Sequence, residues 1–261
     1  MFGILWNTIL ITPLLNALAI LYQLSGSLGL SIILFTVIIK AILTPLVMPS
    51  MKTMKKQRDL QPELDKLKEK YKHDKKKMAE MQMELFKQHG LNPASGCVTQ
   101  IATIVVLIAL YGVIQRFAIN ADVDVLNTLI YFDAFKFKVG EVVNTQFLWW
   151  DLAKPDRFFV FALLSGALQF LASKMMMPYV EAGEKAAQKT PDKKDDMAYN
   201  MQEQMLYTMP VMNVIIGLTL PAGVVLYIII STVFSIVQTY YVSGWGGLKP
   251  LVHKLWKKLR K

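Results

Sequence analysis

The stretch LGLSIILFTVIIKAILTPLVMP, residues 28–49, contains one charged residue, Lys40, in an otherwise uncharged and mostly apolar run. At a rise of about 1.5 Å per residue, an α-helix of this length covers about 30 Å, the thickness of the hydrocarbon core of a bilayer. Because backbone amides find no water in lipid, a segment that crosses the membrane must be helical. We therefore predict a first membrane-spanning helix within residues 25–50.

Four further apolar runs follow along the chain, which is 54% hydrophobic. We predict that they span the membrane as helices at residues 94–118, 158–178, 206–220 and 223–242. Only a short Leu-Pro-Ala-Gly turn, starting at Leu220, separates the last two, which predicts a tight helical hairpin. The pattern is that of an all-α integral membrane protein with a five-helix transmembrane bundle.

The charged residues are segregated from the apolar runs, and the net charge is +10. Residues 51–92 are rich in Lys, Glu, Gln, Met and Leu, which favour helices. Their apolar residues form two separate faces on either side of His73-Asp74, so we predict a helical hairpin. Positive charge collects in cytoplasmic loops, which places this hairpin in the cytoplasm.

The remaining loops fix the predicted orientation. Residues 119–157 carry six acidic and four basic residues and are expected outside, with Trp149 and Trp150 in the headgroup zone. The polar loop 179–205 and the basic tail 243–261 are expected in the cytoplasm. The start of the chain lacks the basic region of a secretory signal. We therefore predict a mature, multi-pass protein of the bacterial plasma (inner) membrane, with its N-terminus outside and its C-terminus in the cytoplasm.

Residues 1–24 are apolar, but a stripe of polar residues occupies one helical face: Thr8, Thr12, Asn16 and Gln23. We expect an interfacial helix with this face toward water. A helix that spans the membrane remains the alternative.

Lys40 lies near the middle of its span, where a lysine costs about 2.5–3.5 kcal/mol. Its side chain could extend along the helix to the cytoplasmic interface. We favour the alternative in which it faces a wet cavity and meets polar or acidic parts of a passing chain. Thr36 and Thr44 lie one turn before and after it, on the same face.

Other spans carry polar stripes as well. Such residues often hold membrane helices together, but several of them near one buried cation favour a hydrophilic chamber. The stripes comprise Gln100 and Thr103 in the second span, Ser165, Gln169 and Ser173 in the third, and Ser231, Ser235 and Gln238 in the fifth.

Signatures of enzymes are missing from the sequence. All three histidines fall in segments expected to be cytoplasmic, and there is no H-E-x-x-H, P-loop or dinucleotide motif. No acidic pair lies within a span. We expect no catalytic residues, no metal and no cofactor.

The order and spacing of four segments resemble the YidC insertase family. These are TVIIKAILTPL (36–46), LQPELDKLKEKYKHDKKKMAEMQMELFKQHGLNP (60–93), SGC (95–97) and LPAGVVLYIIISTVFSIVQ (220–238). The resemblance implies a helical bundle around a positively charged groove that opens to cytoplasm and lipid and is closed outside. It also implies a bacterial member without the large outer domain.

The resemblance further assigns roles to residues. Lys40 matches the position of the groove arginine, Thr36 and Tyr227 match positions near the substrate path, and residues 1–24 match the outer interfacial helix. The implied function is a membrane protein insertase and chaperone whose substrates are nascent membrane proteins. The alternatives are a small solute permease with an anion-binding chamber at Lys40 and a scaffold for membrane complexes.

Further partners follow from charge and from the implied function. The basic tail and the hairpin could bind a ribosome through phosphates, and the tail could bind anionic lipids. A Sec translocon is a further candidate partner. We expect no DNA partner.

Overall fold

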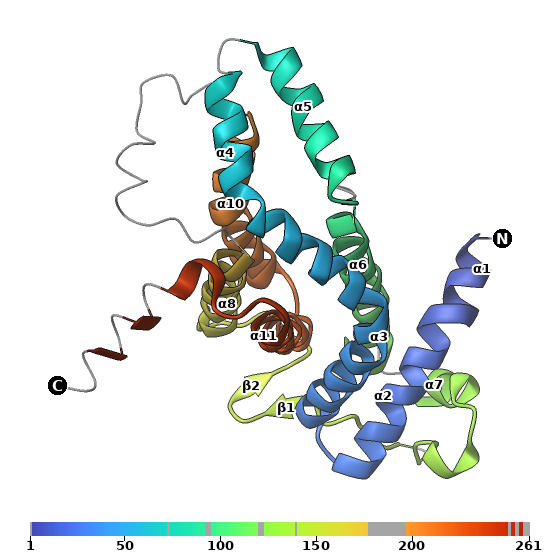
Figure 1. Ribbon diagram of the computed structural model, residues 1–261. Coiled ribbons are helices and arrows are strands. Elements are labelled where there is room, and N and C mark those ends of the chain that lie inside the picture. Colours follow the sequence, from blue (N-terminus) through green and yellow to red (C-terminus); the bar gives the residue numbers. More distant parts are fainter. Residues whose placement is uncertain are drawn as a thin grey trace. The chain divides into compact units, whose positions relative to one another are not determined.

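Long helices account for most of the chain in the computed structural model (Figure 1). The structure describes residues 2–71, 74–91, 95–119, 123–138, 140–176 and 197–249, with residues 252, 253, 256 and 257. Its elements are α1 (Phe2–Trp6), η1 (Asn7–Ile11), α2 (Thr12–Ser25), α3 (Leu28–Asp59), α4 (Gln61–Lys70), α5 (Lys75–Gln88), α6 (Ser95–Ile114), η2 (Gln115–Ile119), α7 (Val123–Leu129), η3 (Asp133–Phe135), β1 (Gln146–Phe147), β2 (Trp150–Asp151), α8 (Val160–Met176), α10 (Met197–Thr219), α11 (Ala222–Ser243) and η5 (Gly246–Leu248).

The chain divides into two compact units. The first unit comprises Met1–Leu43, Ala102–Gln169 and Met209–Phe234. The second unit comprises Thr44–Ile101, Phe170–Thr208 and Ser235–Lys261. The division falls within α3, α6, α8, α10 and α11, so each of these helices contributes to both units.

The predicted all-α membrane protein is confirmed. Among the described residues, four helical segments are by length and composition able to cross a membrane, namely Asn7–Ser25, Leu28–Asp59, Ile101–Ala118 and Ala222–Ser243. Two shorter apolar helices, Val160–Met176 and Leu206–Thr219, fall where the third and fourth spans were predicted. The number of helices that actually cross the membrane remains a prediction.

Helix α3 extends beyond the predicted first span. It continues through Pro45 and Pro49 and ends at Asp59, nine residues past the expected boundary at residue 50. A proline removes one backbone donor and usually kinks a helix, but the Lys, Met and Gln residues that follow favour helical structure. The Thr53 hydroxyl donates to the Pro49 carbonyl at 3.1 Å, within the same helix.

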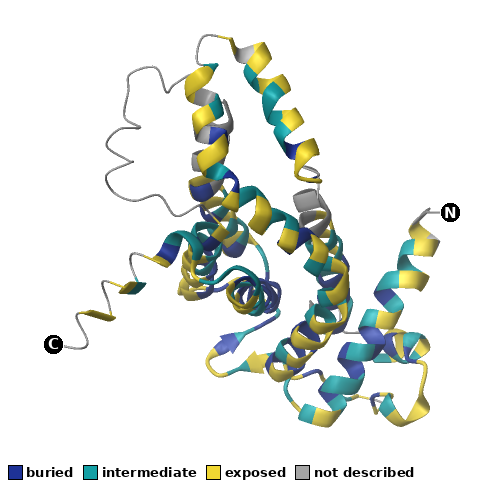
Figure 2. Ribbon diagram, viewed as in Figure 1, coloured by how far each residue is buried: buried dark blue, intermediate teal, exposed yellow. Residues whose placement is uncertain are grey.

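The core of the first unit collects around the start of α11 (Figure 2). Every residue from Pro221 to Ile229 is buried. Their neighbours in the apolar core include Leu15 and Leu18 of α2, Ile32 and Phe35 of α3, and Leu110 and Phe117 of α6 and η2. In the 18-residue apolar stretch of α11, 61% of the residues are buried, against 22% in the corresponding stretch of α3. The first part of α11 is therefore enclosed by protein, whereas a smaller share of the apolar residues of α3 is buried.

The polar stripe of residues 1–24 does not face water along its whole length. Asn16 is buried: its amide donates to the Leu129 carbonyl at 2.9 Å and its side-chain oxygen accepts from the Tyr131 amide at 2.7 Å. The Thr12 hydroxyl bonds to the Asn7 carbonyl. The expected orientation is therefore wrong for Asn16, because the end of α7 and the loop after it supply partners that the stripe alone could not reveal.

The loop before α8 is fastened to the turn between α10 and α11. The amides of Ala222 and Gly223 donate to the carbonyls of Lys154 and Leu152 at 2.8 and 2.9 Å. A Cβ atom on Gly223 would lie 3.1 Å from the Leu152 oxygen, so glycine permits this approach. These bonds tie the loop to the start of α11 and hold together one end of the first unit, named here its closed end.

Asp156 organises the start of α8. Its buried carboxylate accepts from the Trp150 indole at 2.9 Å and from the amides of Phe158 and Phe161 at 2.9 and 2.7 Å. Trp150 stacks on Phe161 and is buried, whereas Trp149 is exposed. Trp150 is therefore a core residue of the first unit, and the position of both tryptophans in the headgroup zone stays a prediction.

In the second unit, α4 and α5 form two helical arms. Leu60, Leu64, Phe86 and Leu91 make a small apolar cluster between them. Asp74 caps α5 by accepting from the Lys77 amide at 3.0 Å. The predicted turn residue His73 lies outside the described residues, as do residues 179–196 of the predicted loop 179–205 and much of the tail 243–261. The prediction of a loop is wrong for residues 197–205, which form the start of α10.

Candidate functional site

Lys40 stands in a thinly covered part of α3. Its side chain is half-buried, while Val37, Ile38, Ala41 and Ile42 around it are exposed. One turn earlier, Thr36 is fully buried, and its hydroxyl donates to the Ile32 carbonyl at 2.6 Å. The cation therefore sits where apolar side chains of α3 lack protein cover, next to a face that packs into the core.

The two predicted site residues of α11 lie together within the core. Tyr227 and Ser231 are one turn apart, are both buried, and hydrogen-bond to each other through their side chains. Thr232 beside them donates to the Ile228 carbonyl at 2.8 Å. The polar side chains of this short segment find hydrogen-bond partners within α11, so they can be buried without leaving an unpaired polar group.

Gln169 connects α8 to α10. Its side-chain oxygen accepts from the Asn213 amide at 3.2 Å. One turn earlier on α8, the buried Ser165 hydroxyl bonds to the Ala162 carbonyl at 2.8 Å and approaches the Asn213 carbonyl at 3.4 Å. These contacts match the alternative in which the stripe on the third span holds helices together. Whether Gln169 also contacts a substrate stays a prediction.

Close backbone packing supports the same pair of helices. A Cβ atom on Gly217 of α10 would lie 2.8 Å from Cα of Ala162 on α8, and one on Gly166 would lie 3.1 Å from the Pro210 oxygen. Small residues let membrane helices approach in this way. Polar contacts and small residues together therefore fix α8 against α10.

The other predicted site residues are Thr103, Thr44 and Gln100. Thr103 is half-buried on α6 in the first unit. Thr44 belongs to the second unit, where its hydroxyl accepts from the Gln238 amide at 2.7 Å. Gln100 lies on α6, and its side chain is outside the described residues. Thr44 and Gln238 were predicted as members of two polar stripes, and the structure brings them into contact.

Sequence reasoning missed two polar residues. Asn213 is an amide within the apolar run VMNVIIG, a signal that could have singled it out. Asn7 accepts from the Arg116 guanidinium at 2.9 Å, which links the π-helical turns η1 and η2. Such turns disrupt the regular helical hydrogen bonding and often occur at functional sites. No group of three or more potential metal ligands occurs among the residues that the structure describes.

Comparison with known proteins shows which family the chain resembles. The family model described as 60Kd inner membrane protein matches residues 20–246. "Membrane protein insertase YidC" of Fusobacterium nucleatum subsp. nucleatum is 33% identical over 222 residues, covering 85% of this chain and 89% of that protein. "Membrane protein insertase MisCA" of Bacillus subtilis is 30% identical over 244 residues, covering 92% of this chain and 79% of that protein.

Two further relatives are longer than this chain. "Membrane protein insertase YidC" of Geobacter sulfurreducens is 32% identical over 240 residues, which cover 91% of this chain and 38% of that protein. The crystal structure titled "Active YidC insertase crystal structure with the first transmembrane domain resolved" has a TM-score of 0.60 at 24% identity. The match covers 90% of this chain and 46% of that one, and it shows a shared fold. The chain belongs to the family of the 60Kd inner membrane protein, which is the YidC family.

Proposed function

We propose that this protein is an insertase that transfers nascent membrane proteins into the lipid bilayer and helps them fold. The observation that carries the proposal is Lys40, a cation on an apolar helix whose surroundings are largely uncovered by protein. The names of the relatives support the same activity. Charged residues within membrane helices are costly and usually serve a function.

The proposed mechanism begins with the hydrophilic flank of a nascent chain. Lys40 pairs with polar or acidic groups of that flank and lowers the cost of removing them from water. Thr103, which is half-buried, assists, while the buried Thr36, Tyr227 and Ser231 form part of the groove wall. Gln169 is a further groove candidate of the first unit. Thr44 and Gln100, which were predicted for the groove as well, belong to the second unit.

Release to the bilayer needs no cofactor or catalytic residue in this proposal. The apolar segment of the substrate leaves the groove sideways, driven by the burial of apolar surface in lipid. The bonds from the α10–α11 turn to Lys154 and Leu152 support a groove closed at its outer end. The groove would then open toward the cytoplasm and the lipid.

The proposed orientation keeps the N-terminus outside and the C-terminus in the cytoplasm, in a bacterial plasma membrane. Residues 1–24 lie in the outer interface, although Asn7–Ser25 is long and apolar enough to span. The α4–α5 hairpin receives the nascent chain, and its basic residues and those of the tail contact a ribosome or anionic lipids. A Sec translocon remains a candidate partner.

Charge variants of Lys40 test the proposal. The measurement is the rate at which proteoliposomes insert a single-spanning test substrate that carries an acidic flank. Loss of one charge-assisted contact is expected to slow insertion about tenfold in Lys40→Ala. Lys40→Glu should slow it further because it repels the flank, and Lys40→Arg should insert normally.

The matched control is Lys52→Glu, which changes an exposed charge on the same helix. It should leave the rate unchanged. Normal insertion by both Lys40→Ala and Lys40→Glu would refute the proposed role of the cation. Anion uptake by the proteoliposomes, in place of insertion, would instead support a permease.

A further inference from the structure

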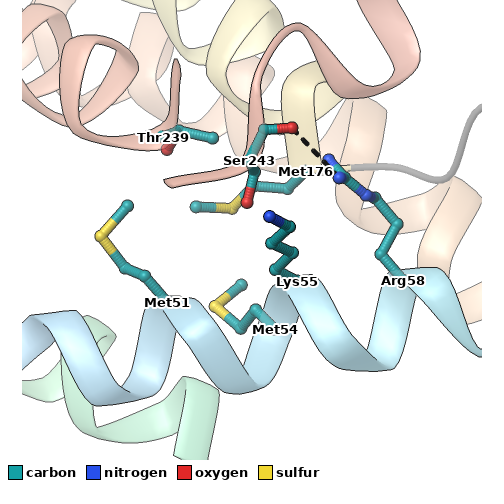
Figure 3. A pocket seen from close by; sticks show the side chains of 7 residues that line it. All are labelled: Met51, Met54, Lys55, Arg58, Met176, Thr239 and Ser243. Atoms are coloured by element: carbon teal, nitrogen blue, oxygen red, sulfur yellow. Dashed lines mark hydrogen bonds between the residues drawn. The ribbon is translucent and has the colours of Figure 1, made fainter. Parts of the chain in front are cut away.

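A small pocket in the second unit combines cationic, hydroxyl and thioether groups (Figure 3). It is narrow and partly open to solvent. Lys55 and Arg58 of α3 line one part of it, and Thr239 and Ser243 of α11 contribute hydroxyl groups. The combination suits an anion.

Arg58 is the fixed cation of this pocket. Only 14% of its side chain is exposed, and one terminal nitrogen donates to the Ser243 carbonyl at 3.1 Å. Its Nε atom lies 3.6 Å from the carboxylate of Asp59, which is 57% exposed. A guanidinium has five N–H groups, so these two contacts leave donors that can face a ligand.

The loop after α11 holds the guanidinium in place. A Cβ atom at Gly246 would clash with the Met175 carbonyl and would lie 2.9 Å from a terminal nitrogen of Arg58. Gly246 also has a φ of +48°, in the left-handed region that favours glycine. Only glycine therefore allows the loop to pass this close to Arg58.

Lys55 is the accessible cation. Its side chain is exposed, and Figure 3 shows it rising from the same helix as Arg58 toward Ser243. Within the described ranges of the chain, no carboxylate lies at ion-pair distance from it. The pocket thus has one anchored and one adaptable positive charge, and the carboxylate of Asp59 offsets part of the former.

The rest of the lining is apolar and flexible. Met51, Met54 and Met176 complete the pocket, and methionine adapts to ligands of irregular shape. Aromatic residues at the same end of α11 are exposed: Tyr240, Tyr241 and Trp245. Tyrosine and tryptophan in such positions are typical of the headgroup layer of a membrane.

We propose that this pocket binds the phosphate of an anionic phospholipid. Arg58 and Lys55 would face the phosphate, the two hydroxyls would bond to its oxygens, and the methionines would contact the glycerol and the first acyl carbons. A free phosphate would use the cations but gain nothing from the three methionines. The proposed site goes beyond insertion, since lipid binding here does not depend on whether the protein inserts others.

Native mass spectrometry of the full-length protein in detergent tests the site, with phosphatidylglycerol as the probe. Lys55→Glu should weaken binding of the tightest phosphatidylglycerol at least about fivefold, because it removes one charge-assisted contact with the phosphate and puts a repelling carboxylate in its place. Lys55 has an exposed side chain, so the variant should fold. Lys52→Glu makes the same charge change on the same helix outside the pocket, and should bind like the wild type.

Two further binding measurements identify the ligand. Phosphatidylethanolamine should bind more weakly than phosphatidylglycerol, and millimolar inorganic phosphate should not displace the bound lipid. Equal losses in Lys55→Glu and Lys52→Glu, or no loss in either, would overturn the proposal in favour of diffuse attraction. Complete displacement by inorganic phosphate would overturn it in favour of a site for free anions.

Discussion

The closed end of the first unit and the α4–α5 hairpin of the second unit are built in opposite ways. Between Asn144 and Phe161, backbone and side-chain bonds connect the β1–β2 hairpin, the start of α8 and the α10–α11 turn. The α4–α5 hairpin has a buried cluster of four residues, and most of its other described side chains are partly or fully exposed.

The difference separates a fixed part of the molecule from an adaptable one. Many satisfied buried groups make local opening costly, whereas a small apolar cluster leaves the hairpin at the low end of local stability. Adaptable surfaces suit binding to varied partners. The proposed function uses both: a closed outer end, and a hairpin that receives different nascent chains.

Of the changes that test this difference, removing the carboxylate of Asp156 should have the largest effect on the free energy of unfolding. Asp156→Ala leaves three donors without their acceptor, two of them in buried bonds, and should cost about 3 kcal/mol of unfolding free energy. Denaturant unfolding of the purified protein, monitored by tryptophan fluorescence, measures it. Asp133→Ala, at an exposed carboxylate of the same loop, is the control and should be about as stable as the wild type. Equal stability of the two variants would mean that the Asp156 network does not hold this end.

Truncating Phe86 should have a smaller and strictly local effect. Phe86→Ala removes one of the four buried residues between α4 and α5 and should lower the free energy of local opening by about 2 kcal/mol. Hydrogen exchange should then speed up in residues 61–88 only. Met83→Ala, at an exposed position of α5, should exchange like the wild type. Faster exchange throughout the first unit would show that the hairpin is not an independent part.

The smallest expected effect is a pH dependence at the closed end. Burial disfavours the charge of Asp151, but hydrogen bonds from Lys154, Thr145 and the Ala153 amide outweigh it and keep its pKa below the ordinary value of 3.8. A lowered pKa in the folded state stabilises the protein above the unfolded pKa, and this contribution is lost as the pH falls through the folded value.

Unfolding free energies of wild type and Asp151→Asn at pH 7 and below pH 4 measure this contribution. The wild type should lose more stability than the variant on acidification, by less than about 1 kcal/mol because Lys154 is largely exposed. Parallel pH profiles for the two proteins would assign the acid sensitivity of this end to other groups.

The helices were predictable from the sequence because the backbone of an apolar run in lipid must satisfy its own hydrogen bonds, and a helix does so within one segment. The extension of α3 past residue 50 was not, since prolines usually signal an end and the residues that override Pro45 and Pro49 are ordinary helix formers. The environment of Asn16 depends on a contact with Leu129, far along the chain, and that of Trp150 on the way the next loop folds back onto it; periodicity contains neither.

The candidate site was predictable in part. Lys40 was conspicuous because a charge in an apolar run has few explanations. The pairing of Thr44 with Gln238 and of Gln169 with Asn213 required knowledge of which helix faces meet. Asp156, before the apolar residues of α8, carried a recognisable helix-start signal that the sequence analysis did not use.

The two prolines of α3 have a consequence for water. Because Pro45 has no N–H group, the carbonyl of Ala41 loses its regular donor four residues later, and Ala41 is exposed. An oxygen in that state attracts hydration, which lipid cannot supply. The free carbonyl of Ala41 and the ammonium group of Lys40 therefore both favour bound water at the same position. The main chain and the side chain together favour local hydration of an otherwise apolar helix.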